Sequence, residues 1–204
     1  ELLLKLNEIA ETKLKIDSSG SEWTSQVFYY NTHNNSDQAY STRYYSPAIF
    51  ITAGDGSADN KRELVSGRTD LRLKLKKRFT LETGLKSTLH LFKNNTLFYT
   101  ENGGIRQPDV NRTNRFNYKE NINSAYVQGS KTMGKDIVVK FGTRLENTNM
   151  RGDQEIPSDT SFAIHRTDLF PYIYLSKSLM KIAGYDLRAY LVYRRTITRP
   201  VYEQ

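Results

Sequence analysis

Apolar and polar residues alternate along three segments of the chain, Phe79–Leu91, Ile137–Leu145 and Tyr185–Tyr193. In the first segment, five of the seven odd positions are apolar and none of the six even positions is. Successive side chains of a β-strand point to opposite faces of its sheet, whereas a helix would scatter the same residues around its axis. The pattern therefore predicts three strands, each with one apolar and one charged face.

A less regular form of the same pattern predicts strands elsewhere, roughly nine in all, with no evident domain boundary. The further strands are expected at Leu2–Ile16, Glu22–Asn31, Gln38–Thr52, Arg62–Lys76, Tyr118–Lys131 and Tyr172–Leu179. Polar breaks are expected at Ser18–Ser21, Thr32–Asp37 and Ala53–Asn60. The predicted fold class is all-β, an antiparallel up-and-down meander with little or no helix, because parallel strands would need long crossovers.

The predicted connections alternate in length. Tight turns join the strands near Lys77-Arg78, Thr132–Asp136 and Met180–Gly184, whereas long polar stretches occupy Lys93–Arg115 and Asn147–Thr167. Short turns at one end and long loops at the other are typical of outer-membrane β-barrels. A soluble β-sandwich also has unequal loops, so the pattern favours part of a transmembrane barrel and leaves the sandwich open.

Composition changes this picture only in part. The chain has 204 residues, a net charge of +8 and no cysteine, which excludes a disulfide framework and cysteine chemistry. Its aromatic content of 12% is too high for a disordered chain. The longest apolar runs, such as Ala48–Ile51, are far shorter than a membrane helix requires. No signal peptide is evident at Glu1, so we expect a processed precursor or an excised piece.

Two segments imitate known binding loops. Gly129–Asp136 nearly matches a phosphate-binding loop, but that loop requires a following helix, and the next segment alternates as a strand. Asp55, Ser57 and Asp59 imitate the start of a calcium loop, but Asn60 and Ser66 stand where glycine and glutamate are needed. We therefore expect a hairpin turn at the first segment and a solvated turn at the second.

The remaining candidate residues do not form a catalytic or metal pattern. His33, His90 and His165 lack ligand spacing, and His90 falls on the polar face of its strand. The carboxylates of Asp153, Glu155 and Asp159 share a loop that the sequence predicts to be flexible, without a positioned partner. We therefore expect no enzyme activity, no metal and no cofactor. A basic hairpin carries the residues Lys74, Lys76, Lys77 and Arg78. Basic residues also occur along most other strands, so we expect no nucleic-acid partner.

The C-terminal half contains four motifs: FNYKENINSAYVQ from Phe116, GTRLENT from Gly142, TDLFP from Thr167 and YRRTITRP from Tyr193. These motifs resemble the barrel of TonB-dependent outer-membrane receptors, specifically the large outer-membrane barrel family of Bacteroidota. They occur in the family's order and with its gaps, over roughly Arg68–Tyr202. Arg194 and Thr196 depart from the serine and second arginine expected in the last motif.

The resemblance implies a receptor that binds a scarce extracellular ligand and imports it across the bacterial outer membrane, with a lipid bilayer, a plug domain and the TonB system as partners. About nine strands cannot close a barrel similar to the roughly 22-stranded transporters. Residues 1–204 are therefore expected to form a partial barrel without plug or remaining strands. The alternative is a complete small β-barrel or a soluble β-sandwich that acts as a binding module.

Two expectations concern the faces and the ligand. One common side of the sheet should meet lipid, and the opposite side, with Lys86, Lys140, Arg144 and Arg188, should meet the lumen. Ligand specificity should come from Lys93–Arg115 and Asn147–Thr167, although the ligand-binding residues and the ligand cannot be read from these loops. The residues expected on the lipid side are Leu81, Leu85, Leu89, Ile137, Val139, Phe141, Leu187, Ala189 and Leu191.

Overall fold

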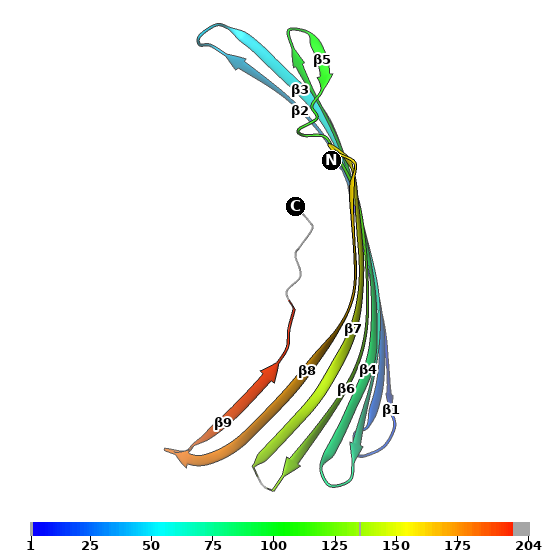
Figure 1. The fold of residues 1–204 in the computed structure, drawn as a ribbon, viewed down its shortest axis with the longest axis vertical. Helices are drawn as coiled ribbons and strands as arrows, with labels where there is room; N and C mark the ends of the chain where they lie inside the picture. The colour runs from blue at the N-terminus through cyan, green and yellow to red at the C-terminus, as the bar shows by residue number, and fades with distance from the viewer. Residues whose placement is uncertain (1, 135, 198–204) are drawn as a thin grey trace.

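The computed structural model describes residues 2–134 and 136–197. They form one curved antiparallel sheet in the strand order β1-β2-β3-β4-β6-β7-β8-β9, with the short β5 paired to β4 beside β6 (Figure 1). The described part of the chain contains no helix, so the predicted all-β meander is confirmed. The strands are β1 (Leu2–Lys15), β2 (Glu22–Tyr44), β3 (Phe50–Leu75), β4 (Phe79–Asn102), β5 (Ile105–Pro108), β6 (Asn114–Met133), β7 (Ile137–Ile156), β8 (Thr160–Ile182) and β9 (Tyr185–Arg194).

Several strands are longer than the sequence pattern predicts. The strand expected at Gln38–Thr52 is wrong, because that segment contains the turn between β2 and β3. The polar breaks expected at Thr32–Asp37 and Ala53–Asn60 are wrong as well, since these segments pair with each other over Asn34↔Asn60 to Asp37↔Ser57. Alternation fails there because both faces of the sheet are polar, and backbone pairing to neighbouring strands continues without it.

The two predicted long loops are also mostly strand. Lys93–Arg115 contains the end of β4, all of β5 and the start of β6, and Asn147–Thr167 contains the end of β7 and the start of β8. Gly103 and Gly104, with φ of 60° and 80°, form the tight turn between β4 and β5. The chain therefore extends upward as paired hairpins instead of loose loops (Figure 1).

Short turns close the opposite end of the sheet. Ala183 and Gly184 form the two-residue turn between β8 and β9, with φ of 50° and 86°. Gly129–Asp136 is confirmed as part of a hairpin, since β6 ends at Met133 and β7 begins at Ile137. The short turns at this end match the prediction, whereas the opposite end has strands joined by turns in place of the predicted long loops.

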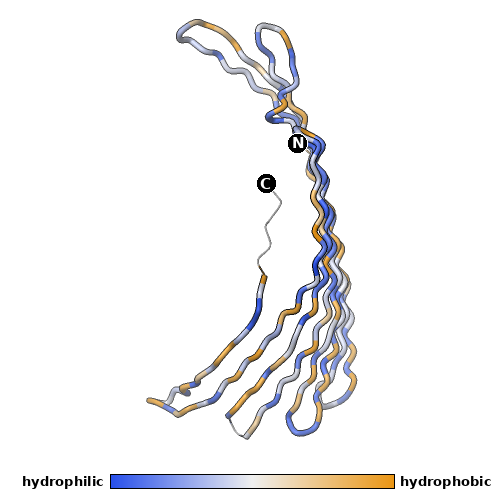
Figure 2. Tube along the Cα trace, in the orientation of Figure 1, coloured by the Kyte–Doolittle hydropathy of each residue, from blue (hydrophilic) through white to orange (hydrophobic). Residues whose placement is uncertain are grey.

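Strand register confirms the predicted faces. Cross-strand partners point to the same side, and the odd positions of β2, β3, β4, β6, β7 and β9, with those of β8 up to its bulge after Ser178, form one continuous face. Leu85↔Ala125, Phe141↔Ile173 and Leu175↔Leu191 are examples of its pairs. All nine residues expected on a common side lie on this face. Lys86, Lys140, Arg144 and Arg188 lie on the other side. Apolar and polar residues alternate along the lower parts of the strands (Figure 2).

Burial identifies which face is concave. Side chains converge on the inside of a curved sheet and spread apart on its outside. On β7 the even positions Glu146, Thr148 and Met150 are 5%, 1% and 5% exposed. The odd positions Phe141 and Leu145 are 53% and 50% exposed. We therefore call the face of the even β7 residues the inner face and the face of the odd ones the outer face.

The described sheet has two free edges. β1 and β9 stand at its ends, and no hydrogen-bonded pairing between these two strands occurs in the described ranges. All the described strands belong to a single sheet, which is not the two-sheet arrangement of a sandwich. The described strands thus form an open wall instead of a closed barrel.

Candidate functional site on the inner face

The lower inner face carries a network of charged and hydrogen-bonded side chains. Arg72 on β3 contacts Glu22 at 3.3 Å on one side and Glu82 at 2.7 Å on the other. Gln128 on β6 donates to the second oxygen of Glu82 at 2.6 Å, and Lys13 on β1 contacts Glu22 at 2.7 Å. Five neighbouring strands, β1, β2, β3, β4 and β6, are therefore tied together by paired groups, which offsets the cost of holding charges on a partly buried face.

A second part of this network surrounds Tyr126. Its hydroxyl donates to Asp70 at 2.6 Å, and Asp70 also forms an ion pair with Arg68. The ring lies where the inner face of β4 carries Gly84, and a Cβ at that position would collide with both Asp70 and the Tyr126 ring. The glycine is therefore required for the ring to lie flat across β4.

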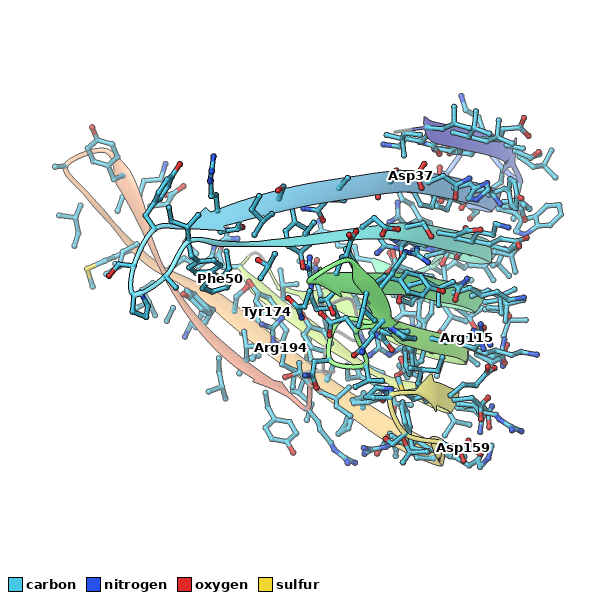
Figure 3. All side chains as sticks on the ribbon, turned by 90° about the horizontal axis from the view of Figure 1, so that it is seen from above. Asp37, Phe50, Arg115, Asp159, Tyr174 and Arg194 are labelled. Carbon is cyan, nitrogen blue, oxygen red and sulfur yellow. The ribbon has the colours of Figure 1, made fainter. Side chains whose placement is uncertain are left out.

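Phe170 and its neighbours continue the lower inner face toward β9. Arg144 and Arg195 lie over its ring at 4.8 and 5.7 Å from the centroid. Arg195 also contacts Asp168 at 3.2 Å. Tyr174 and Arg194, labelled in Figure 3, lie on β8 and β9 and belong to this inner face by register. Arg199, Pro200 and Tyr202 of the resemblance fall outside the described residues.

The upper inner face has a different chemistry. Phe92, Phe116 and Tyr118 pack in series, with ring centroids 6.5 and 6.3 Å apart, and His90 meets Tyr118 edge to face at 6.1 Å. Arg62 lies over the Phe92 ring at 5.6 Å. We call these five residues the inner aromatic cluster. Aromatic faces of this kind stack on rings and on flat groups of a ligand.

Amide and hydroxyl groups surround the inner aromatic cluster. Asn94 donates to Asn60 across β3 and β4. Among the described residues, the buried side-chain atoms Thr32 Oγ1, Asn34 Oδ1, His90 Nε2 and Asn114 Oδ1 have no hydrogen-bond partner. All four belong to the inner face by register. Unpaired polar groups are costly when buried, so a contact that rearranges this face and satisfies them is favourable.

A further aromatic group lies near the tip. Arg112 stacks on Phe98 at 4.1 Å and on Tyr40 at 5.2 Å. The two rings cover Gly56 and Gly54, where a Cβ would collide with them. The inner face therefore presents aromatic rings from the middle of the sheet to its upper tip.

The structure also locates the other residues singled out from the sequence. Asp55 and Asp59 lie in β3 and not in a solvated turn, so that expectation is wrong. Asp55 accepts two hydrogen bonds from Arg106 at 3.0 and 2.7 Å, and Asp59 contacts His33 at 2.9 Å. The Arg106 guanidinium holds the pKa of the Asp55 carboxyl below its usual range.

The carboxylates near the upper end of β7 are likewise ordered. Asp153 and Glu155 lie in the strand and form ion pairs with Arg151 at 2.9 Å and Arg115 at 3.1 Å, so the expected flexible loop is wrong there. Asp159 lies in the turn between β7 and β8. No group of three or more His, Asp or Glu side chains that could hold a metal occurs within residues 2–134 and 136–197.

Sequence analysis did not single out the inner aromatic cluster. Phe116 and Tyr118 flank the end of one expected loop, and Phe92 directly precedes its start. Their place in the alternation was the available signal: these aromatic residues occupy even positions, as the charged residues do, whereas the lipid-side leucines occupy odd positions. A search for aromatic residues on the polar face of the predicted strands would have found them.

Comparison with known proteins now identifies the family. The model of the outer membrane protein β-barrel family matches residues 14–204, and the chain belongs to that family. A search of curated proteins found no match. The protein is located in the bacterial outer membrane, and its outer face is the side that meets lipid. No helix in the described part of the chain is long and apolar enough to cross a membrane.

Membership of this family indicates how high the two regions of the inner face lie relative to the membrane. Transmembrane strands need about 9–11 residues to cross a bilayer, whereas β2, β3 and β4 have 23, 26 and 24. Short turns lie on the periplasmic side of such barrels, so the long upper hairpins project outside the cell. The charged network therefore lies at membrane height, and the inner aromatic cluster lies near or above the outer boundary of the membrane.

Proposed function

We propose that the chain is the barrel segment of a TonB-dependent receptor, which binds an extracellular ligand on its inner face and imports it across the outer membrane. The observation that carries the proposal is the inner aromatic cluster, placed on the extracellular half of a barrel wall. Stacking rings beside amide groups are a binding surface, and they include no arranged nucleophile or acid–base pair. The proposal accordingly assigns transport and no catalysis.

The open edges at β1 and β9 support a further part of the proposal. An unpaired strand edge in a membrane would leave backbone groups without partners in hydrocarbon. In the proposed receptor, further strands pair with both edges, and a plug domain rests against the charged lower inner face. Energy for import then comes from TonB acting on that plug.

The test uses the intact receptor in its own bacterium and in purified form. Binding and uptake are measured for iron chelates, cobalamin, oligosaccharides and peptides. For the ligand that binds, Phe116→Ala should weaken binding by about 5- to 30-fold, because one stacked ring contributes about 1–2 kcal/mol. Tyr193→Ala, on the exposed outer face, is the matched control and should leave binding unchanged.

Removal of TonB separates binding from transport. The proposal expects uptake to stop while surface binding remains. Equal uptake with and without TonB would contradict the transport mechanism, and unchanged binding in both Phe92→Ala and Phe116→Ala would contradict the placement of the ligand.

A further inference from the structure

The outer face bears a groove bounded by polar residues on its upper side. Small outward side chains at Ser25, Gly67 and Ala125 leave a hollow of about 700 Å³ between the larger Val27, Leu85 and Leu145. A second hollow of about 600 Å³ lies beside Leu14, Trp23 and Leu71 and shares Thr69 and Leu85 with the first. Together they form a continuous apolar furrow, which runs down the lipid side toward the periplasmic turns.

Asparagine side chains border the upper end of this groove. Asn123 and Asn147, which line it, lie directly opposite each other on β6 and β7, and Asn121 and Asn149 form the next outward pair above them. We call these four residues the outer amide cluster. Ser87 donates to Asn123 at 2.7 Å, and Asn147 donates to Thr167 at 3.1 Å. Within the cluster Asn123 donates to Asn121, and Asn149 donates to Asn147. Each side-chain amide has further donor and acceptor sites that hydrocarbon would leave unsolvated, so the cluster belongs at headgroup height.

Like charges oppose each other directly above the outer amide cluster. Lys119 lies opposite Arg151 across β6 and β7, and Lys61 lies opposite Lys93 across β3 and β4. Directly opposed like charges destabilise a sheet. Arg151 and Lys61 have partners in their own strands, Asp153 at 2.9 Å and Asp59 at 3.7 Å.

The other two cations of this surface, Lys93 and Lys119, are exposed, and the described residues provide them with no ion pair. The outward carboxylate of Glu63 on β3 lies one row below Lys93. An anion from outside the chain would relieve the repulsion between these lysines and the neighbouring cations.

We infer that this outer surface binds a phosphorylated glycolipid of the outer leaflet. Lys93 and Lys119 contact its phosphate groups, the outer amide cluster binds its sugar hydroxyls, and one acyl chain lies in the furrow below. From top to bottom, the lysines, the outer amide cluster and the furrow follow the order in which such a lipid presents its phosphorylated sugar headgroup and its acyl chains to a barrel wall. The surface faces away from the lumen, so it is separate from the proposed ligand site.

The test measures binding of bisphosphorylated lipid A in detergent micelles to the intact, delipidated protein. The double variant Lys93→Gln/Lys119→Gln should bind about 25-fold more weakly, since one basic residue at an anionic surface contributes about fivefold. Lys86→Gln, on the inner face of the same strand as Lys93, is the matched control and should bind as the parent does. Phosphatase-treated lipid A should bind the parent and the double variant equally and weakly.

A second variant tests the furrow. A Cβ added at Gly67 would meet no atom within 4 Å, so Gly67→Leu fills the hollow without displacing a neighbour. It should weaken lipid A binding about tenfold and leave the preference for phosphate unchanged. Equal affinity of the parent for phosphorylated and dephosphorylated lipid would overturn the inference. The inference would also be overturned if the double variant bound lipid A as the parent does but lost a protein that copurifies with the parent.

Discussion

The lower and upper halves of the inner face share one backbone geometry and differ in their side chains. Below, charged groups are paired across strands, as around Arg72 and Tyr126. Above, aromatic rings and amides dominate, and several polar atoms of the described residues have no hydrogen-bond partner. Paired groups stabilise the wall, whereas unpaired groups beside stacking rings are ready for another molecule. The lower half therefore contributes stability, and the upper half contributes recognition.

The outer face divides at a similar height. Below the outer amide cluster it is apolar, as at Phe141, Leu145 and Ile173, and above it the outward residues are mostly polar. Both faces thus change chemistry where the strands leave the bilayer. A membrane strand is therefore specified by two patterns: alternation across the sheet and a change in composition along it.

The largest expected effect tests the division on the outer face. Ile173→Arg places a charge on the lipid side of β8 and should destabilise the barrel folded in a bilayer by about 2–4 kcal/mol. Ser161→Arg is the matched control, on the same strand and face but above the apolar region, and should destabilise it by less than about 1 kcal/mol. Refolding of the intact barrel into vesicles, followed against urea concentration, measures both. Similar losses for the two variants would mean that the apolar region is not the membrane span.

A smaller effect tests the division on the inner face. Tyr126→Phe removes the hydroxyl that donates to Asp70 and should lower the unfolding free energy by about 1.5–3 kcal/mol, because the acceptor is charged. Tyr174→Phe is the matched control: its ring packs under Lys140, an interaction that phenylalanine keeps. Ligand binding should be unchanged in both. A Tyr126→Phe protein with normal stability and impaired ligand binding would reverse the roles assigned to the two halves.

Sequence reasoning predicted the lower half of the sheet well. Alternation of leucines with lysines and glutamates located β4, β7 and β9 and assigned their faces, because at this height one side must be apolar and the other polar. The turns were predicted for the same reason, since Ala183-Gly184 and the residues near Gly134 interrupt a strong pattern.

The upper half was predicted poorly, and the reason is physical. At Asn34, Asn60 and Asn94 both faces meet polar surroundings, so no alternation distinguishes strand from loop. These residues still form strands, because the pairing of backbone groups between long neighbours does not depend on side-chain polarity. The inner aromatic cluster was missed with them, since it is assembled from β3, β4 and β6 and only the register brings its members together.

The smallest effect compares two carboxylates at opposite ends of the wall. Asp17, in the periplasmic turn, accepts hydrogen bonds from the Ser19 hydroxyl at 2.6 Å and the Ser21 amide at 3.0 Å, which hold its pKa well below the usual range. Asp55, in the upper hairpins, has its pKa lowered mainly by hydrogen bonds from the charged Arg106. Both pKa values are lower in the folded state, so each carboxylate stabilises its region above pH of about 4, and this contribution is lost as the pH falls through the folded pKa.

The pKa values of these two carboxylates should respond differently to salt. Neutral groups donate the hydrogen bonds to Asp17, so its pKa should stay low at an ionic strength of about 1 M. Screening of the exposed Arg106 should raise the pKa of Asp55. NMR titration of the carboxyl carbons at low and high salt measures both shifts in one sample, and Arg106→Gln should reproduce the effect of salt on Asp55 alone. The opposite result would be a pKa for Asp55 that changes with neither salt nor Arg106→Gln. In that case neutral hydrogen bonds would stabilise Asp55 as they do Asp17, and the two ends of the sheet would not differ in their electrostatics.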